Sequence, residues 1–353
     1  DQPRSRGLGD VYKRQIKASF SGNSFNPLIS ISLNSESFKR ITCSFYNYTP
    51  IKEPEVQRDN IYSYFESLNI FGRVYIASEG INAQISVPDY KWKEFKQGLK
   101  NYKILKNMPI KKALSDGISF YKLVVKVKKE IVAYGLSDHI YDMNKVGQYL
   151  KPEEFNKAIE EDNTAVIDMR NFYETEVGRF KNAEIPLVEK SKELLPEVRR
   201  MLNGREDHQV LLYCTGGIRC EKASAFLINS GISNVKQLHG GIIQYAHDVR
   251  RKEIESKFIG KNFVFDARLG ERITDDVIAN CHICGSPSDT HRDCNNDACH
   301  ILFIQCNQCE KKYDGCCSTE CKEFSSLPIS KQKELRKHPK RVIKKRYFRS
   351  PKI

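Results

Sequence analysis

Residues 209–231 read QVLLYCTGGIRCEKASAFLINSG, and this stretch decides the fold of the middle of the chain. An apolar, β-rich run, Gln209–Tyr213, leads directly into Cys214. A helical pattern, Glu221–Ser230, follows and stops at Gly231. The order of strand, tight loop and helix predicts a parallel α/β domain. Ligands of open parallel sheets bind at the carboxyl ends of the strands, where Cys214 stands.

The loop after this strand favours a thiolate. Gly216 and Gly217 allow a tight backbone turn that aims several N–H groups toward Cys214. The following helix points the positive end of its dipole at the same place, and Arg219 adds a fixed charge. Because the thiolate is the reactive form of cysteine, Cys214 and Arg219 are the candidate catalytic residues. The other residues of the loop are expected to shape or support it: Thr215, Gly216, Gly217, Ile218 and Cys220.

The spacing from Cys214 to Arg219 is Cys-x4-Arg. Phosphatases of the cysteine class use Cys-x5-Arg, whose wider loop wraps a tetrahedral phosphate. The shorter loop suits a smaller group bound to the cysteine, such as a single extra sulfur atom. The ordinary alternative is a buried structural cysteine at a strand–helix turn.

The string Cys214–Lys222, CTGGIRCEK, resembles the active-site loop of rhodanese domains, and most closely that of the tRNA uridine(34) hydroxylases. The resemblance extends from about Cys43 to Cys321. It implies a rhodanese-like parallel α/β catalytic domain at residues 138–258. It also implies an oxygen-dependent hydroxylation of the wobble uridine, position 34, to 5-hydroxyuridine, with Cys214 as the essential thiol.

Molecular oxygen is then the co-substrate and tRNA the partner, since an anticodon loop presents splayed bases that proteins read one by one. The sequence shows no flavin or nicotinamide motif. The alternative is a rhodanese-type sulfurtransferase that carries a persulfide on Cys214. The short loop disfavours a phosphatase. The hypothesis of a catalytically silent RNA- or protein-binding module does not explain why the loop favours a thiolate.

Asp168-Met169-Arg170, at the end of a short apolar run, resembles the rhodanese Asp-x-Arg motif. The resemblance implies that Asp168 and Arg170 brace the region beside the active loop. We favour a structural ion pair over direct catalysis.

Residues 41–137 show strand and helix patterns in the order βαββαβ, which predicts a ferredoxin-like α+β domain. The expected strands are 41–48, 72–77, 81–87 and 118–127, with a further strand at 130–134 and helices at 55–68 and 90–99.

Glu79-Gly80-Ile81-Asn82 resembles the Glu-Gly-Ile-Asn motif of the same hydroxylases, although Ala83 stands where the family usually has Gly. Two interpretations stay open, a plain connection between strands and a substrate contact through Glu79 and Asn82.

Residues 259–325 form a cysteine-rich segment. It opens with the Phe-Val-Phe-Asp-Ala-Arg string at 263–268, which resembles the same family. Two Cys-x2-Cys turns, Cys281/Cys284 and Cys306/Cys309, match a four-cysteine zinc ribbon, in which zinc supplies the folding energy. The preferred ligands of a second zinc are Cys294, Cys299, Cys317 and Cys321, with Cys316 as an equal alternative to Cys317. The remaining interpretation is a set of spare or redox-active thiols.

The formal net charge of +14 is concentrated in the basic tail, residues 326–353, where positions 331–353 hold eleven Lys or Arg and a single Glu. The tail either runs along a phosphate backbone, with Lys344, Lys345 and Arg346 as contacts, or is a solvated end.

Residues 1–40 are expected to be disordered or artefactual, since Asp10–Gln15 is also what a sequencing adapter encodes when translated. No run approaches the roughly 18 apolar residues of a membrane span, and no signal-peptide pattern is seen. Clustered cysteines beside a reactive thiol indicate a reducing compartment, so a cytoplasmic location is predicted.

Overall fold

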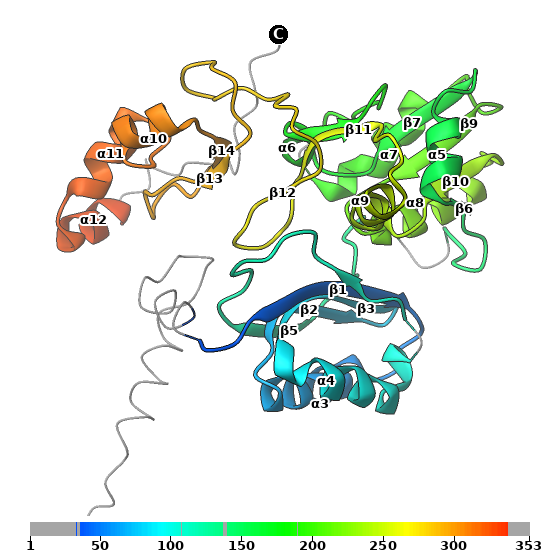
Figure 1. Ribbon diagram of the computed structural model, residues 1–353, viewed down its shortest axis with the longest axis horizontal. Helices are drawn as coiled ribbons and strands as arrows, with labels where there is room; N and C mark the ends of the chain where they lie inside the picture. The colour runs from blue at the N-terminus through cyan, green and yellow to red at the C-terminus, as the bar shows by residue number, and fades with distance from the viewer. Residues whose placement is uncertain (1–32, 34–35, 107, 137–139, 189, 338–353) are drawn as a thin grey trace, which may run out of the picture. The chain divides into compact units, whose positions relative to one another are not determined.

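The computed structural model describes residues 33, 36–106, 108–136, 140–188 and 190–337 (Figure 1). The described residues from Phe38 onward belong to one compact unit. The predicted disordered or artefactual N-terminus, apart from a few residues, lies outside the described residues, as do positions 338–353 of the predicted basic tail. The architecture is mixed α/β, as predicted.

The N-terminal domain is a sheet covered by two helices. Its elements are β1 (Arg40–Tyr48), α3 (Pro54–Ser67), β2 (Phe71–Ala77), β3 (Gly80–Pro88), α4 (Trp92–Gly98), β4 (Lys111–Lys112) and β5 (Leu123–Val127). The strand order is β4-β1-β3-β2-β5. Strands β1 and β2 pair antiparallel with β3, and β4 pairs antiparallel with β1. The first four strands therefore form the predicted ferredoxin-like arrangement, and β5 extends it by pairing parallel with β2.

Of the predicted strands of this domain, the one at 130–134 is wrong, and the one at 118–127 is present as β5 but in another place in the sheet. Strand β4, not the run at 118–127, closes the ferredoxin-like motif. A strand of two residues is too short to show the alternation by which strands are recognised. Residues 130–134 form no strand, because the Glu79 carboxylate accepts the Ile131 N–H at 2.7 Å and so replaces a strand partner.

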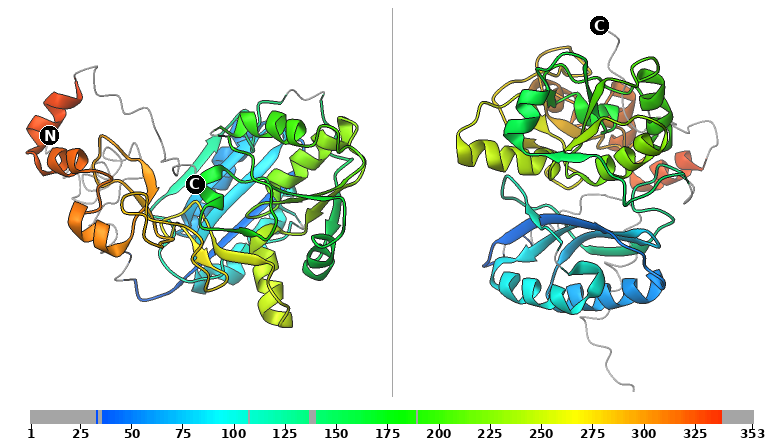
Figure 2. Two further views of the ribbon diagram at one scale, coloured as in Figure 1. Left: turned by 90° about the horizontal axis from the view of Figure 1, so that it is seen from above. Right: turned by 90° about the vertical axis from the view of Figure 1, so that its right-hand side faces the viewer.

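The two faces of this sheet differ in character. Helices α3 and α4 lie on the same face (Figure 1 and Figure 2), where Phe45, Val74 and Ile85 pack with Phe65 and Phe95. Successive side chains of a strand point to opposite faces, so the neighbours of these residues face away from the helices. Those neighbours are polar or aromatic and line a cavity: Ser44, Tyr46, Arg73, Tyr75, Asn82 and Gln84.

The central domain is built on a parallel sheet. Its elements are β6 (Gln148–Leu150), α5 (Pro152–Ala158), β7 (Thr164–Asp168), α6 (Phe172–Thr175), β8 (Gly178–Phe180), α7 (Ser191–Met201), β9 (Gln209–Tyr213), α8 (Ile218–Asn229), β10 (Val235–Leu238) and α9 (Gly241–Lys252). The order is β6-β10-β9-β7, and every pairing is parallel. This confirms the predicted rhodanese-like class of fold. Residues 148–150, at the start of the predicted domain, form its edge strand.

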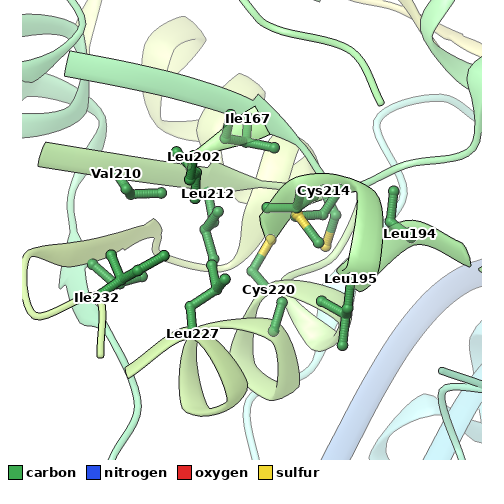
Figure 3. Packing of buried hydrophobic residues seen from close by; sticks show 14 of the residues in the cluster. Ile167, Leu194, Leu195, Leu202, Val210, Leu212, Cys214, Cys220, Leu227 and Ile232 are labelled. Carbon is green, nitrogen blue, oxygen red and sulfur yellow. The ribbon is translucent and has the colours of Figure 1, made fainter. Parts of the chain in front are cut away.

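Strand β9 is buried along its whole length, and helix α8 packs against it. Leu212 of the strand, Leu227 of the helix and the two cysteines share one apolar cluster (Figure 3). The loop between strand and helix is therefore held at both ends by buried apolar residues.

The C-terminal segment is short of apolar residues. It comprises β11 (Phe258–Asn262), β12 (Glu271–Arg272), β13 (His291–Asp293), β14 (Leu302–Ile304), α10 (Asn307–Tyr313), α11 (Thr319–Ser326) and α12 (Ile329–Arg336). Strand β11 pairs with β8 of the central domain, and β13 pairs with β14. One small cluster here consists mainly of cysteines, with Ile301 and Phe303. Among the described helices, none combines the length and the apolar character needed to cross a membrane.

Candidate active site

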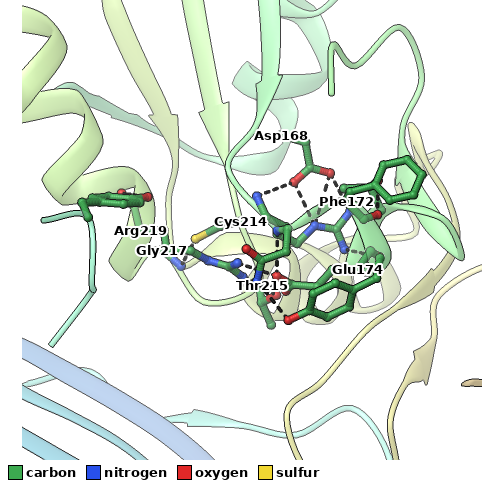
Figure 4. A network of polar contacts seen from close by, with 12 residues as sticks. Asp168, Phe172, Glu174, Cys214, Thr215, Gly217 and Arg219 are labelled. Carbon is green, nitrogen blue, oxygen red and sulfur yellow. Dashed lines mark hydrogen bonds and ion pairs between the residues drawn. The ribbon is translucent and has the colours of Figure 1, made fainter. Parts of the chain in front are cut away.

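The sulfur of Cys214 is fully buried at the carboxyl end of β9. The Gly217 N–H donates to it at 3.1 Å (Figure 4). Burial raises the pKa of the Cys214 thiol, but hydrogen bonds from Cys220, the charge of Arg219 and the Gly217 N–H outweigh burial and lower this pKa to about 5. Burial and the contact with Cys214 hold the pKa of Cys220 well above its usual range. At neutral pH, Cys214 is therefore a thiolate and Cys220 a thiol that donates to it.

Two glycines are needed for the shape of the loop. Gly217 has φ +97°, in the left-handed region that favours glycine. A Cβ on Gly241 would lie 2.6 Å from the Cys214 carbonyl oxygen, so only glycine lets the start of α9 approach. There, the N–H groups of Ile242 and Ile243 donate to the carbonyls of Cys214 and Thr215. The amino end of α9 thus anchors the loop.

Arg219 does not present a free charge. Its guanidinium donates to both oxygens of Glu174, at 2.6 and 2.9 Å, and to Thr215 Oγ1 at 3.3 Å. Glu174 is fully buried and also accepts the Asn171 N–H at 2.8 Å, which caps α6. Glu174 is a site residue to which the sequence analysis assigned no role, and the capping pattern Asn-x-x-Glu was the local signal for it. The ion pair ties α6 to the loop and keeps Arg219 in place beside the sulfur.

Asp168 and Arg170 form a fully buried ion pair. The Arg170 guanidinium donates to the Asp168 carboxylate through Nε at 2.9 Å and Nη2 at 2.7 Å. It also donates to the Gly178 carbonyl at 2.6 Å. These contacts join the end of β7 to the start of β8, beside the loop. The geometry supports a bracing role for the pair.

We expect Asp168→Ala to lower the free energy of unfolding by about 3–5 kcal/mol, because it strands the Arg170 charge in the interior. The matched control is Glu184→Ala, which breaks a half-exposed pair with Arg205 and should cost at most about 1 kcal/mol. Thermal denaturation of both variants gives the comparison. An unchanged melting temperature with lost activity in Asp168→Ala would indicate direct catalysis instead.

The ionisation of Cys214 is directly measurable. The ultraviolet thiolate absorbance of the protein, minus that of Cys214→Ser, should titrate with a midpoint near the pKa of about 5. Since folding lowers this pKa, the thiolate stabilises the fold above the ordinary thiol pKa. That stabilisation is lost as the pH falls through about 5. A midpoint near the ordinary value of about 8.5 would contradict the proposed electrostatics of the loop.

A cavity of about 450 Å³ lies between the open face of the N-terminal sheet and the Cys214 loop. Thr215, Gly216 and Arg219 form its wall on the loop side, whereas the Cys214 sulfur lies beneath them. The segment around Phe265 closes a further side. The cavity is thus built from all three parts of the chain.

The Glu-Gly-Ile-Asn motif divides between two places. Glu79 accepts from the fully buried Lys222 at 2.8 Å and from the Tyr141 hydroxyl at 3.0 Å. Lys222 lies on α8 and also pairs with Glu130 at 2.8 Å. Asn82, by contrast, lines the cavity. The structure thus places Asn82 in the wall of the cavity and Glu79 in the contact between the N-terminal domain and α8. Lys344, Lys345 and Arg346 lie outside the described residues.

Two tyrosines of β1 add to this contact between the domains. The Tyr46 hydroxyl donates to Glu221 Oε2 at 2.7 Å, and the Tyr48 hydroxyl donates to the Ile218 carbonyl at 3.1 Å. Both acceptors belong to the first turns of α8, so the N-terminal domain contacts the element that positions Arg219 and Cys220.

The eight predicted metal ligands meet in two groups. Within each group the sulfurs lie within 4.8 Å of one another: Cys281, Cys284, Cys306 and Cys309; and Cys294, Cys299, Cys317 and Cys321. Sulfur pairs lie 3.6–3.7 Å apart in both groups. Tetrahedral bonds of about 2.3 Å place sulfurs roughly 3.8 Å apart, so the donors fit a zinc ion. Cys317 belongs to the second group, while the Cys316 sulfur contacts Ser325 Oγ at 3.5 Å. Both groups can hold a metal ion.

Three family models match the chain in succession. They are the UPF0176 acylphosphatase like domain at residues 40–131, the Rhodanese-like domain at residues 151–248 and the Rhodanase C-terminal at residues 259–322. Their borders agree with the three parts described above.

Similar proteins cover almost the whole chain. A tRNA uridine(34) hydroxylase of Leptospira interrogans is 48% identical over 353 residues, which is 100% of this chain and 92% of that protein. The tRNA uridine(34) hydroxylase of an Enterobacter species is 49% identical over 314 residues, 88% of this chain and 90% of that protein. On this extent of identity, the chain belongs to the tRNA uridine(34) hydroxylase family.

Proposed function

We propose that this chain hydroxylates C5 of the wobble uridine, position 34 of tRNA, to give 5-hydroxyuridine, with molecular oxygen as the co-substrate and an external thiol as the two-electron reductant that converts the second oxygen atom to water. The observation that carries the proposal is the thiolate-favouring loop at Cys214, which lies against a cavity that the N-terminal domain closes. Family membership supplies the substrate and the reaction class.

The cavity suits a single everted base. Its volume of about 450 Å³ falls within the range of small-ligand pockets, about 300–1,000 Å³. Tyr46, Tyr75 and Phe265 offer rings on which a base can stack. The amides of Asn82 and Gln84 can both donate to and accept from the edge of uracil. Enzymes that modify a base inside folded nucleic acid take it out of the stack. In an anticodon loop the bases are unpaired, so the free-energy cost of unstacking one of them is small.

Cys214 is the proposed nucleophile. A thiolate that adds to C6 of uracil places electron density on C5, which is the carbon that receives oxygen. Since the sulfur lies beneath Thr215 and Gly216, the loop must shift to expose it. A Cβ at Gly216 would meet nothing within 4 Å, so open space lies beside the loop at this residue.

The tail and the N-terminal motif are proposed as further contacts to tRNA. Lys344, Lys345 and Arg346 would neutralise phosphates, and Asn82 would bind the base. Glu79 would act through the domain contact that it makes with Lys222.

Each of the two cysteine groups is proposed to hold one structural zinc ion. The ions would supply folding energy to a segment with few apolar residues and no step of the reaction. The proposed location is the cytoplasm, since thiolate chemistry and zinc–cysteine sites both need reduced cysteines.

The test of the function is mass spectrometry of wobble nucleosides from cells that lack this protein and from cells that regain it. 5-Hydroxyuridine should disappear on deletion and return on complementation. Unchanged levels in both strains would exclude the proposed reaction.

The alternative is sulfur transfer through a persulfide on Cys214. It is favoured by one observation: the Gly217 N–H and the Cys220 thiol, which stabilise the thiolate, would also stabilise a persulfide anion. Purified protein that transfers sulfur from thiosulfate to cyanide, and leaves tRNA unmodified, would support this alternative.

A further inference from the structure

Lys111 occupies an unusual position for a lysine. It lies on β4, the short strand beside β1, and its side chain is only 6% exposed. It lines the cavity together with Tyr46, Thr215 and Gly216. Its Nζ lies 4.7 Å from the centre of the Tyr46 ring. Its Cε would lie 3.4 Å from a Cβ on Gly240, so the end of the side chain lies beside the start of α9, which anchors the Cys214 loop.

Lys111 and Arg219 both act electrostatically on the Cys214 thiolate, but they differ in how they are held. Arg219 is bound to Glu174 through both carboxylate oxygens. Among the described residues, no carboxylate lies within ion-pair distance of Lys111, and the nearby Glu221 accepts from the Tyr46 hydroxyl.

The surroundings of Lys111 also favour release of its proton. Burial lowers its pKa to about 8, although the charges of Cys214 and Glu221 act in the opposite direction. From α9, His247 Nε2 lies 2.9 Å from the Lys112 carbonyl oxygen. Lys111 is therefore charged at neutral pH and close to giving up a proton.

We propose that Lys111 is a catalytic residue that binds O4 of the uracil and protonates it as the Cys214 sulfur adds to C6. This inference rests on the proposed function. In the step, the thiolate electron pair forms the S–C6 bond, and the C5=C6 π pair moves to form C4=C5. The C4=O4 π pair moves to O4 and takes the proton from Nζ. The products are an enol bound to Cys214 and a neutral Lys111 amine, so charge and atoms balance without an oxidant.

Lys112 provides a matched control. It is the next residue of the same strand and carries the same charge, but it is exposed and its Nζ lies 5.1 Å from the Trp92 ring. If only the total positive charge matters, Lys111→Met and Lys112→Met should lower the hydroxylation rate equally. If Lys111 is the proton donor, only Lys111→Met should lower the hydroxylation rate.

The experiment measures hydroxylation of a wobble-uridine tRNA transcript by full-length wild type, Lys111→Met, Lys111→Arg and Lys112→Met. Rates are taken at saturating tRNA from pH 5 to 10, beside tRNA affinity and melting temperature. We expect Lys111→Met to lower the rate about 100-fold, within the range of general acid catalysis, and to leave tRNA affinity within a few-fold. Lys112→Met should match the wild type. The wild-type rate should fall above about pH 8, and Lys111→Arg should move this fall to higher pH.

A second variant covers the case in which Lys111→Met is destabilised. Lys111→Ala leaves space in the cavity, so added methylammonium should restore part of the rate, whereas tetramethylammonium, which has no N–H proton to donate, should not. A Lys111→Met rate equal to that of Lys112→Met, or no rescue of a folded Lys111→Ala, would overturn the role of Lys111 alone. Failure of wild type and Lys112→Met to hydroxylate tRNA would overturn the proposed function, and this step with it.

Discussion

Replacement of Cys214 by Ser should abolish the formation of 5-hydroxyuridine while the protein stays folded. The loop lowers the pKa of the Cys214 thiol to about 5, so the nucleophile is already ionised at neutral pH. A serine hydroxyl in the same place stays protonated and cannot add to a pyrimidine at a useful rate. The measurement is the rate of hydroxylation of a tRNA transcript, beside circular dichroism to establish folding.

Cys220→Ser is the matched control for this prediction. Cys220 sits in the first turn of α8 and donates to the Cys214 sulfur, and a serine hydroxyl can replace that hydrogen bond. We therefore expect Cys220→Ser to leave a measurable rate. Equal loss of activity in both folded variants would mean that both sulfurs react, and the assignment of Cys214 as the single catalytic thiol would be wrong.

The second large effect concerns the cysteine-rich segment. Replacing Cys281 and Cys306 by Ser removes two ligands of one group. Structural zinc contributes about 10–16 kcal/mol to folding in small zinc domains, far more than the few apolar residues of this segment can supply. The double variant should lose one zinc ion per chain, and residues 263–321 should become sensitive to protease. Metal analysis and limited proteolysis measure the two effects.

Cys316→Ser is the control for the zinc prediction. Cys316 is buried like the ligands, but its sulfur contacts Ser325 and belongs to neither group. It should retain both zinc ions and resist protease. Absence of zinc from wild-type protein purified under reducing conditions without chelator would remove the zinc proposal.

Features that depend on neighbours in the sequence were predicted well. The strand before Cys214, the glycine turn and the helix after it follow from local pattern, and the structure has them at Gln209–Tyr213 and Ile218–Asn229. The first cysteine group follows from its two Cys-x2-Cys turns, and the second has its ligands in two pairs with three or four residues between them, since ligands of one ion are often close in sequence. The choice of Cys317 over Cys316 needed the structure, because both stand at nearly the same spacing from Cys321.

Features that depend on contacts between distant residues were missed. Lys111 lies more than 100 residues before Cys214 in sequence, and β4 is too short for a strand pattern. Glu79 and its partner Lys222 are 143 positions apart in sequence. The Glu79 motif is therefore compatible, from the sequence alone, with either a connection between strands or a substrate-binding site. The Arg219–Glu174 pair spans 45 positions, and from the sequence Arg219 looks like a free cation. In each case the partner is set by tertiary packing within or between domains, which no local pattern records.

The most direct test of the proposed reaction is hydroxylation of tRNA by purified protein under isotopically labelled dioxygen, with dithiothreitol present to supply the two electrons that reduce the second oxygen atom to water. Uridine 34 of an unmodified transcript is isolated after the reaction and analysed by mass spectrometry, with Cys214→Ser in parallel. We expect 5-hydroxyuridine that carries one labelled oxygen atom in the wild-type reaction and unmodified uridine in the variant. Unmodified uridine 34 in the wild-type reaction, or labelled product from folded Cys214→Ser, would contradict it.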